Sequence, residues 1–184
     1  MQDILFAFWF LLPAALANGA PVFSNVIPGL KHWNTRMDGD RTFRGKEIFG
    51  AHKTWRGLVC GVVVATITFW IQQLCVEHFA WAQQIVGNIP YAQLPTLLLG
   101  ALFGVGALGG DAVESFFKRQ KGVPSGGTWI PFDQLDYIIG AVLVSLPFII
   151  LSPIQYLWIF VVWFALHVTA SYAGWLMGLK KDPI

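Results

Sequence analysis

The sequence predicts an all-α integral membrane protein with about five transmembrane helices, and two observations support this prediction. Of the 184 residues, 55% are hydrophobic and only 12% are charged, with nine Trp and fifteen Phe. One soluble core of this length does not need so much apolar surface. The apolar residues also form stretches close to the roughly 20 residues that one membrane crossing requires. We therefore expect a single membrane domain over residues 1–184.

Five apolar stretches define the expected helices, at residues 4–26, 57–76, 94–111, 137–154 and 156–179. The first stretch contains Ala15-Leu16-Ala17, which is similar to the cleavage site of a secretory signal, but no Lys or Arg precedes it. Because secretory signals begin with a basic segment, we expect this stretch to remain as a membrane helix.

The distribution of basic residues predicts the orientation in the membrane. All twelve Lys and Arg lie in residues 31–56, 118–121 and 180–181, whereas residues 1–3, 77–93 and 152–155 contain none. Cytoplasmic segments of membrane proteins are enriched in Lys and Arg. We therefore expect a multi-pass protein of the cell membrane with the N-terminus outside, the C-terminus in the cytoplasm and a polar site on the cytoplasmic side.

Two polar cytoplasmic loops are expected, at residues 28–56 and 114–136. The first loop mixes glycine with basic residues, in DGDRTFRGK at residues 38–46 and GAHKTWRG at residues 50–57. Glycine lets backbone amides approach a phosphate closely, and Lys and Arg supply charge and forked donors. A solvated connector is the alternative, but a connector does not require this mixture.

The third stretch ends in residues that can carry chemistry. It contains two Gly-x-x-x-Gly spacings, Gly100 with Gly104 and Gly106 with Gly110, which are typical of closely packed membrane helices. If the helix continues, one of its faces presents a polar group that consists of Asp111, Glu114, Ser115 and Lys118. Carboxylates near the bilayer are costly and usually functional, although an ordinary ion pair between Glu114 and Lys118 is the alternative.

A second acidic pair, Asp133 and Asp136, stands at the entrance to the fourth stretch. Helix capping would explain Asp133 but not Asp136, which begins an apolar run. Mg²⁺ in enzymes typically binds one or two carboxylates together with substrate phosphates. Acids, bases and glycines at a bilayer surface therefore predict nucleotide or phosphate chemistry on a lipid.

Other motifs of phosphate and hydrolytic chemistry are missing from the sequence. It has no Gly-x-x-x-x-Gly-Lys-Ser/Thr loop, no His-Glu-x-x-His and no Gly-x-Ser-x-Gly. Among the histidines, His52 is placed to touch a phosphate, and we expect His167 to be a packing residue. The sequence suggests no nucleic-acid partner, and a homo-oligomer stays open.

Two other functions are alternatives to an enzyme. In a small transporter or channel for an anionic solute, the charged residues would line a gated path, but the expected outer half has almost no polar residues. A lipid-binding assembly factor without catalysis would need the basic loop but not the acids.

At these residues the sequence resembles the CDP-archaeol synthase family, membrane cytidylyltransferases related to CDP-diacylglycerol synthase. The resemblance covers nearly the whole chain. It rests on four blocks, at residues 18–21 (NGAP), 50–57 (GAHKTWRG), 110–119 (GDAVESFFKR) and 133–136 (DQLD). It implies a five-span fold and the Mg²⁺-dependent reaction of CTP with a lipid phosphate, which gives a CDP-lipid and pyrophosphate.

The resemblance also implies roles for individual residues. Four acids would organise the metal and the triphosphate, with Lys118 completing the catalytic group: Asp111, Glu114, Asp133 and Asp136. Six residues would bind substrate phosphates or donate hydrogen bonds to the substrates: Asn18, Lys53, Thr54, Arg56, Ser115 and Arg119. Of the acids, Asp133 and Asp136 are the favoured metal ligands. No covalent nucleophile is needed, because the attacking oxygen belongs to the lipid phosphate.

One departure from the diacylglycerol-type signature bears on the branch of the family. That signature has His-Gly-Gly followed closely by Asp-Arg and a second Asp, whereas here Ser125-Gly126-Gly127 precedes Asp133 by six residues. This favours the archaeol-type branch and leaves the role of the glycines open. The apolar stretches do not distinguish isoprenoid ethers from fatty-acyl esters.

Overall fold

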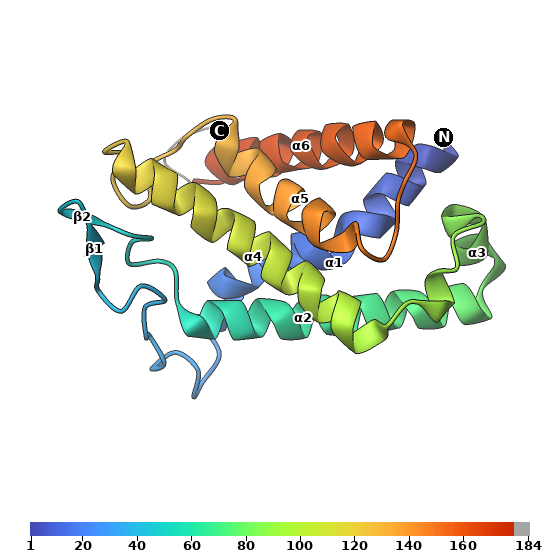
Figure 1. Cartoon of the computed structure of the whole chain (residues 1–184), viewed down its shortest axis with the longest axis horizontal. Coiled ribbons are helices and arrows are strands. Elements are labelled where there is room, and N and C mark those ends of the chain that lie inside the picture. The colour runs from blue at the N-terminus through green and yellow to red at the C-terminus, as the bar shows by residue number, and fades with distance from the viewer. Residues whose placement is uncertain (179–184) are drawn as a thin grey trace.

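The computed structural model describes residues 1–178, and long helices make up most of it (Figure 1). The predicted helix end at Leu179 and the basic pair Lys180 and Lys181 lie outside the described residues. The elements in chain order are α1 (Gln2–Ser24), β1 (Thr42–Phe43), β2 (Lys46–Glu47), α2 (Trp55–His78), α3 (Ala80–Val86), η1 (Tyr91–Gln93), α4 (Thr96–Gln120), α5 (Phe132–Ser145) and α6 (Pro153–Leu176).

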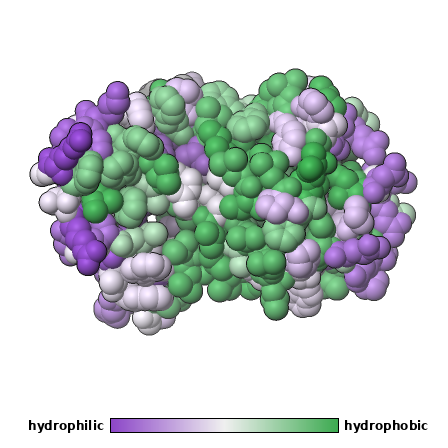
Figure 2. Space-filling model, in the orientation of Figure 1, coloured by the Kyte–Doolittle hydropathy of each residue, from purple (hydrophilic) through white to green (hydrophobic). Residues whose placement is uncertain are grey.

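Four helices among the described residues are long and apolar enough to cross a membrane, namely α1, α2, α4 and α6. Figure 2 shows the matching surface, with an apolar band in the middle and hydrophilic side chains at both ends of the long axis. The prediction of a helical, multi-pass membrane protein is therefore confirmed, although the chain is mostly rather than entirely helical because β1 and β2 form a small sheet. The inside and outside assignment of the two ends stays a prediction.

The fourth predicted stretch, residues 137–154, differs most from the structure. Helix α5 begins earlier, at Phe132, and ends at Ser145 after only 14 residues, which is about 21 Å of helix. The early end coincides with Pro147. Leu146 still has helical backbone angles, but Pro147 has no N–H group with which to continue the helical hydrogen bonds. Helix α6 then begins at Pro153, where Ser152 and Gln155 form a capping box.

Helix α1 lies at the centre of the bundle and contacts every other α-helix. Its side chains Phe6, Phe10 and Leu11 are fully buried. Phe10 packs edge-on against Phe103 of α4, with 5.5 Å between the ring centroids. Such aromatic contacts join α1 and α4 by dispersion and burial.

Two glycine pairs hold α4 against two different neighbours, as the spacing predicted. A Cβ atom at Gly104 would lie 2.5 Å from the backbone of Val62 in α2, and one at Gly106 would lie 2.7 Å from the carbonyl oxygen of Gly140 in α5. At Gly110 the distance to the carbonyl oxygen of Asp136 would be only 2.2 Å. Side chains would push the backbones apart, so glycine permits the contact that brings the acids of α4 and α5 together.

The first polar loop folds over the end of α4. Its strands β1 and β2 pair antiparallel through a tight turn, where Arg44 and Gly45 both have positive φ, as a type I′ turn requires. Lys46 Nζ donates a hydrogen bond to the carbonyl oxygen of Gln120 at 2.7 Å. The buried carboxylate of Asp38 accepts hydrogen bonds from the backbone N–H groups of Phe49 and Gly50.

Candidate active site

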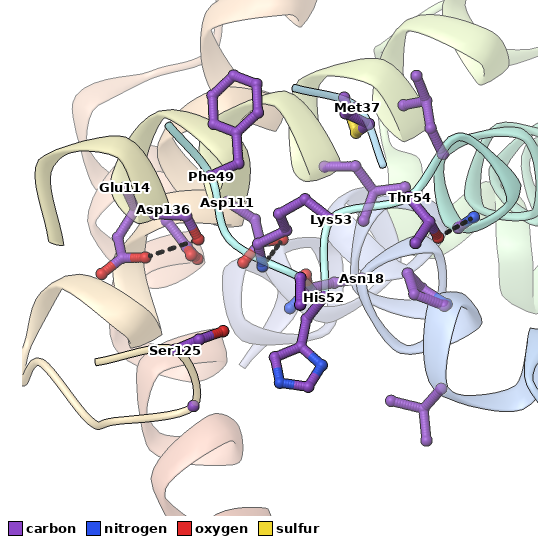
Figure 3. Close-up of a pocket in the computed structure, with 18 of the residues that line it drawn as sticks. Asn18, Met37, Phe49, His52, Lys53, Thr54, Asp111, Glu114, Ser125 and Asp136 are labelled. Carbon is purple, nitrogen blue, oxygen red and sulfur yellow. Dashed lines mark hydrogen bonds and ion pairs between the residues drawn. The ribbon is translucent and has the colours of Figure 1, made fainter. Parts of the chain in front are cut away.

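A cavity of about 740 Å³ opens where the two polar loops meet the adjoining ends of the helices (Figure 3). It is within the size range of ligand pockets. The structure brings all of the predicted site residues to its lining, although they come from widely separated parts of the chain. They are Asn18, Lys53, Thr54, Arg56, Asp111, Glu114, Ser115, Lys118, Arg119, Asp133 and Asp136.

Three carboxylates converge in this cavity. Asp111, Glu114 and Asp136 each offer one oxygen atom, and these atoms lie within 4.8 Å of one another. Asp111 and Glu114 are one helical turn apart on α4, and the glycine contact with α5 brings Asp136 beside them (Figure 3). Glu114 and Asp136 are buried. This oxygen-rich group can hold a divalent cation.

Asp133 lies outside this group of three. Its carboxylate pairs with the ammonium of Lys118 and accepts a hydrogen bond of 2.7 Å from the backbone N–H of Trp129. Lys118 Nζ also lies 3.6 Å from Glu114 Oε1. The ion pair of Glu114 with Lys118, considered above as the alternative to a functional role, therefore exists. Asp133 is nevertheless the closer partner of Lys118, and its hydrogen bond from Trp129 holds the loop before α5.

Lys53 reaches across the cavity to Asp111, with 2.6 Å between Nζ and Oδ2 (Figure 3). It extends from the loop just before α2, where the neighbouring Thr54 accepts a hydrogen bond from the N–H of Gly57 and caps the helix. Lys53 therefore places a positive charge on one of the three converging carboxylates, and Thr54 positions the segment from which Lys53 extends.

Arg56 is a buried cation whose partners are all neutral oxygens. Its Nε donates to Ser24, its Nη2 donates to the side chain of Asn25, and its Nη1 reaches three acceptors in the first loop. These three are the carbonyl oxygens of Leu30 and Lys31 and the side-chain oxygen of Asn34. Arg56 thus joins the end of α1, the first loop and the start of α2.

Arg119 is the opposite case. Only 7% of this residue is exposed, and its Nε and Nη1 atoms are buried without any hydrogen-bond partner in residues 1–178. A buried charge without acceptors is costly, and Arg119 lines the cavity. An anionic ligand in the cavity would supply the acceptors that Arg119 lacks.

The cavity also includes residues that the sequence did not single out for the site. They are Pro21, Val22, Asn25, Asn34, Met37, Phe49, Ala51, Leu58 and Leu108. His52 and His167 also line the cavity, together with Ser125 and Gly126, so the Ser-Gly-Gly segment belongs to the site. His167 was expected only to pack, and its ring does lie 5.9 Å from that of Tyr137.

Comparison with known proteins decides the family. The family model described as CarS-like CDP-archaeol synthase matches residues 1–184. The chain belongs to the CDP-archaeol synthase family. It is therefore an enzyme, a CTP-dependent cytidylyltransferase, and the predicted resemblance is confirmed.

Curated relatives agree with this assignment to the CDP-archaeol synthase family. A CDP-archaeol synthase of Thermococcus onnurineus is 35% identical over 186 residues, which cover 100% of this chain and 98% of that protein. One from Methanospirillum hungatei is 36% identical over 148 residues, 76% of this chain and 82% of that protein.

A solved structure is similar in fold. It is described as an intramembrane enzyme for archaeal membrane lipids biosynthesis. It superposes with a TM-score of 0.69 and 26% sequence identity, covering 89% of this chain and 91% of that chain. The helical membrane architecture is therefore shared with a solved membrane enzyme.

Proposed function

We propose that this member of the CDP-archaeol synthase family transfers CMP from CTP to a membrane lipid phosphate in a Mg²⁺-dependent reaction. The products are a CDP-activated lipid and pyrophosphate. The observation that supports this most is the convergence of Asp111, Glu114 and Asp136 beside basic side chains in one cavity of a membrane protein. The names of the relatives favour an archaeol-type lipid phosphate. We propose 2,3-bis-O-geranylgeranyl-sn-glycerol 1-phosphate as this lipid, and a phosphatidate-like lipid offers the same phosphate.

The donor set fits Mg²⁺. All three groups are carboxylates, the ligand type that this hard cation prefers. Glu114 Oε1 is buried and accepts no hydrogen bond from the described part of the chain, so an acceptor is available. We assign Asp111, Glu114 and Asp136 as the ligands, and Asp133 as the partner of Lys118. When bound, the ion would neutralise and orient the phosphates of CTP.

The basic residues of the cavity would hold the triphosphate. In the reaction, an oxygen of the lipid phosphate attacks the α-phosphorus of CTP, and the bond from that phosphorus to the pyrophosphate oxygen breaks. Negative charge then accumulates on the leaving pyrophosphate. Arg119 and Lys118, at the end of α4, are placed to stabilise this charge. No side chain of the enzyme needs to form a covalent bond with the substrates.

Lys53 is expected to serve both the acidic group and a substrate phosphate. Its ammonium now lies on the carboxylate of Asp111, which is also one of the proposed metal ligands. The ammonium of Lys53 would therefore lie beside the carboxylates that would hold the ion, where it could also pair with a phosphate of CTP or of the lipid. Lys53 would thus preserve charge balance before the substrates arrive.

The cavity is proposed to face the cytoplasm at the cell membrane. Ten of the twelve basic residues are in the two loops around it and at the adjoining helix ends, and basic segments are enriched on the cytoplasmic side. CTP and the lipid phosphate would then meet at the cytoplasmic surface of the bilayer.

The decisive experiment uses purified protein with radiolabelled CTP, Mg²⁺ and a panel of ether-linked and ester-linked lipid phosphates. We expect labelled CDP-lipid and pyrophosphate to form from at least one lipid. Turnover in detergent micelles would also exclude the need for a transport function, because no sealed compartment is present. Failure of every lipid phosphate, with folded protein and bound CTP, would contradict the proposal.

Asp136→Asn provides the sharpest test of the acidic group. The substitution keeps the size of the side chain but removes a charge, and we expect kcat to fall at least about 100-fold. Asp3→Asn is the matched control, because Asp3 lies in the first turn of α1 and does not line the cavity. Full activity of Asp136→Asn at normal expression would argue against a metal at this position.

A further inference from the structure

A second hollow adjoins the cavity on the apolar side of α4 and α5. It has a volume of about 600 Å³. Among residues 1–178, the only charged residues in its lining are Glu114 and Asp136, which also line the polar cavity. The apolar lining comes from both helices and the loop between them: Val105, Val113, Phe117, Trp129, Phe132, Leu135, Ile139, Leu143 and Val144. We call this hollow the α4–α5 groove.

The floor of the groove is backbone. Where α4 and α5 touch, Gly106 faces Gly140, and Gly110 faces the carbonyl oxygen of Asp136. Side chains cannot fill the space at the contact, so the groove remains open beside it. Its walls are exposed apolar groups, with Val113 at 57% and Leu143 at 59% exposure. In a membrane-spanning chain, such walls face hydrocarbon.

The length and ends of the groove match one leaflet. From Val105 to Phe117 along α4 the groove extends roughly 18 Å, and half of a bilayer core is about 15 Å thick. Its end nearest the loops carries Trp129 and Phe132, whose rings lie 4.4 Å apart. Aromatic residues are typical of the interface between headgroups and hydrocarbon, so the groove enters the membrane from the level of the cavity.

We infer that the α4–α5 groove binds one hydrocarbon chain of the lipid phosphate whose headgroup enters the polar cavity. The inference rests on the proposed function, and it identifies a lipid-chain site. Glu114 and Asp136 form the boundary between the two spaces. A lipid with its phosphate among the basic groups therefore has an apolar path for a chain directly beside its headgroup.

Gly109 provides the means of testing this inference. It lines the groove, and a Cβ atom built at this position would meet no atom within 4 Å. A side chain at position 109 therefore projects into open space, and any residue other than glycine or proline favours the helix more than Gly109 does. The neighbouring Gly106 and Gly110 do not offer this test, because their Cβ atoms would collide with α5.

The experiment measures kcat/KM for a long-chain and a short-chain lipid phosphate in Gly109→Ala, Gly109→Leu and Gly109→Trp. We expect the preference for the long chain to fall progressively, at least tenfold in Gly109→Trp. The control is Val63→Trp, which places the same side chain at an exposed position of α2 outside the groove and should keep the wild-type preference. CTP affinity, measured by calorimetry, should not follow the series.

The outcomes separate the two proposals. If wild-type protein converts no lipid phosphate, the proposed function fails first. If wild-type protein is active and Gly109→Trp keeps the wild-type chain preference, the groove does not hold the chain. If Gly109→Trp instead converts a dimer to a monomer in native mass spectrometry, a second copy of the protein covers the groove and the inference is overturned.

Discussion

Two buried arginines that line the same cavity have contrasting surroundings. Arg56, at the junction of α1, α2 and the first loop, donates to five oxygens, and only 3% of the residue is exposed. Arg119, at the end of α4, is almost as buried but has no acceptor for Nε or Nη1 within residues 1–178. Both were predicted to bind phosphate. The contacts of Arg56 are those of a residue that stabilises the fold, whereas the missing acceptors around Arg119 support the proposal that Arg119 binds an anion.

The largest effect is expected for Arg56→Met. This change removes the guanidinium that donates hydrogen bonds to Ser24, to Asn25 and to three acceptors of the first loop. Unpaired buried acceptors of a charged donor cost about 3 kcal/mol, and we expect the free energy of unfolding to fall by this amount. Thermal unfolding in detergent measures it, with Arg56→Lys as an intermediate control. Unchanged stability together with weaker CTP binding would reverse the assignment of the two arginines.

A smaller effect, on binding rather than folding, is expected for Arg119→Met. Loss of a charged hydrogen bond to phosphate costs about 2 kcal/mol, equivalent to about 30-fold weaker CTP binding. Stability without ligand should stay the same or rise, because a buried charge without acceptors is removed. Calorimetric titration with CTP and melting without CTP give the two values, and Arg119→Lys should recover part of the affinity. Parallel loss of stability would show that Arg119 has a structural role.

The smallest effect is expected for Arg36→Met, which tests a third type of surroundings. Arg36 pairs with Asp40 and with Glu47, both more exposed than Arg36 itself. Hydrogen bonds to these two carboxylates raise the pKa of Arg36 above its usual value, so its charge persists at every working pH. Exposed ion pairs contribute about 0.5 kcal/mol. Melting curves of the variant should therefore nearly overlay those of the wild type, and a loss as large as that of Arg56→Met would contradict this ranking.

Much of the fold follows from local patterns in the sequence. Apolar length and the Gly-x-x-x-Gly spacings predicted the long helices and the close packing of α4, and the i, i+3 spacing predicted that Asp111 and Glu114 would share a face. Pro147 is a signal in the sequence for the end of α5, but the apolar residues on both sides of it led to the prediction of one continuous helix over residues 137–154.

The choice of partner could not be predicted in the same way. Asp133 and Asp136 are both acids at the start of the same helix, and the sequence does not tell them apart. In the structure, however, Asp133 pairs with Lys118 and Asp136 lies beside Asp111. Likewise, the residue types in GAHKTWRG do not distinguish Arg56, which is bound to neutral oxygens of the first loop and α1, from Lys53, which pairs with Asp111. These differences depend on the direction of each helix and on loop carbonyl groups, which hydropathy and spacing do not encode.

The shortness of α5 links this enzyme to the thickness of its membrane. At about 21 Å, α5 is shorter than a typical hydrocarbon core of about 30 Å, and the buried side chains of Ile149 and Leu151 continue the path without a helix. A bilayer adapts to a short segment by thinning around it. Because α5 carries Asp136, the depth of this carboxylate in the bilayer depends on the local membrane thickness. The lipids of the surrounding membrane would therefore influence how readily a lipid phosphate reaches Asp136.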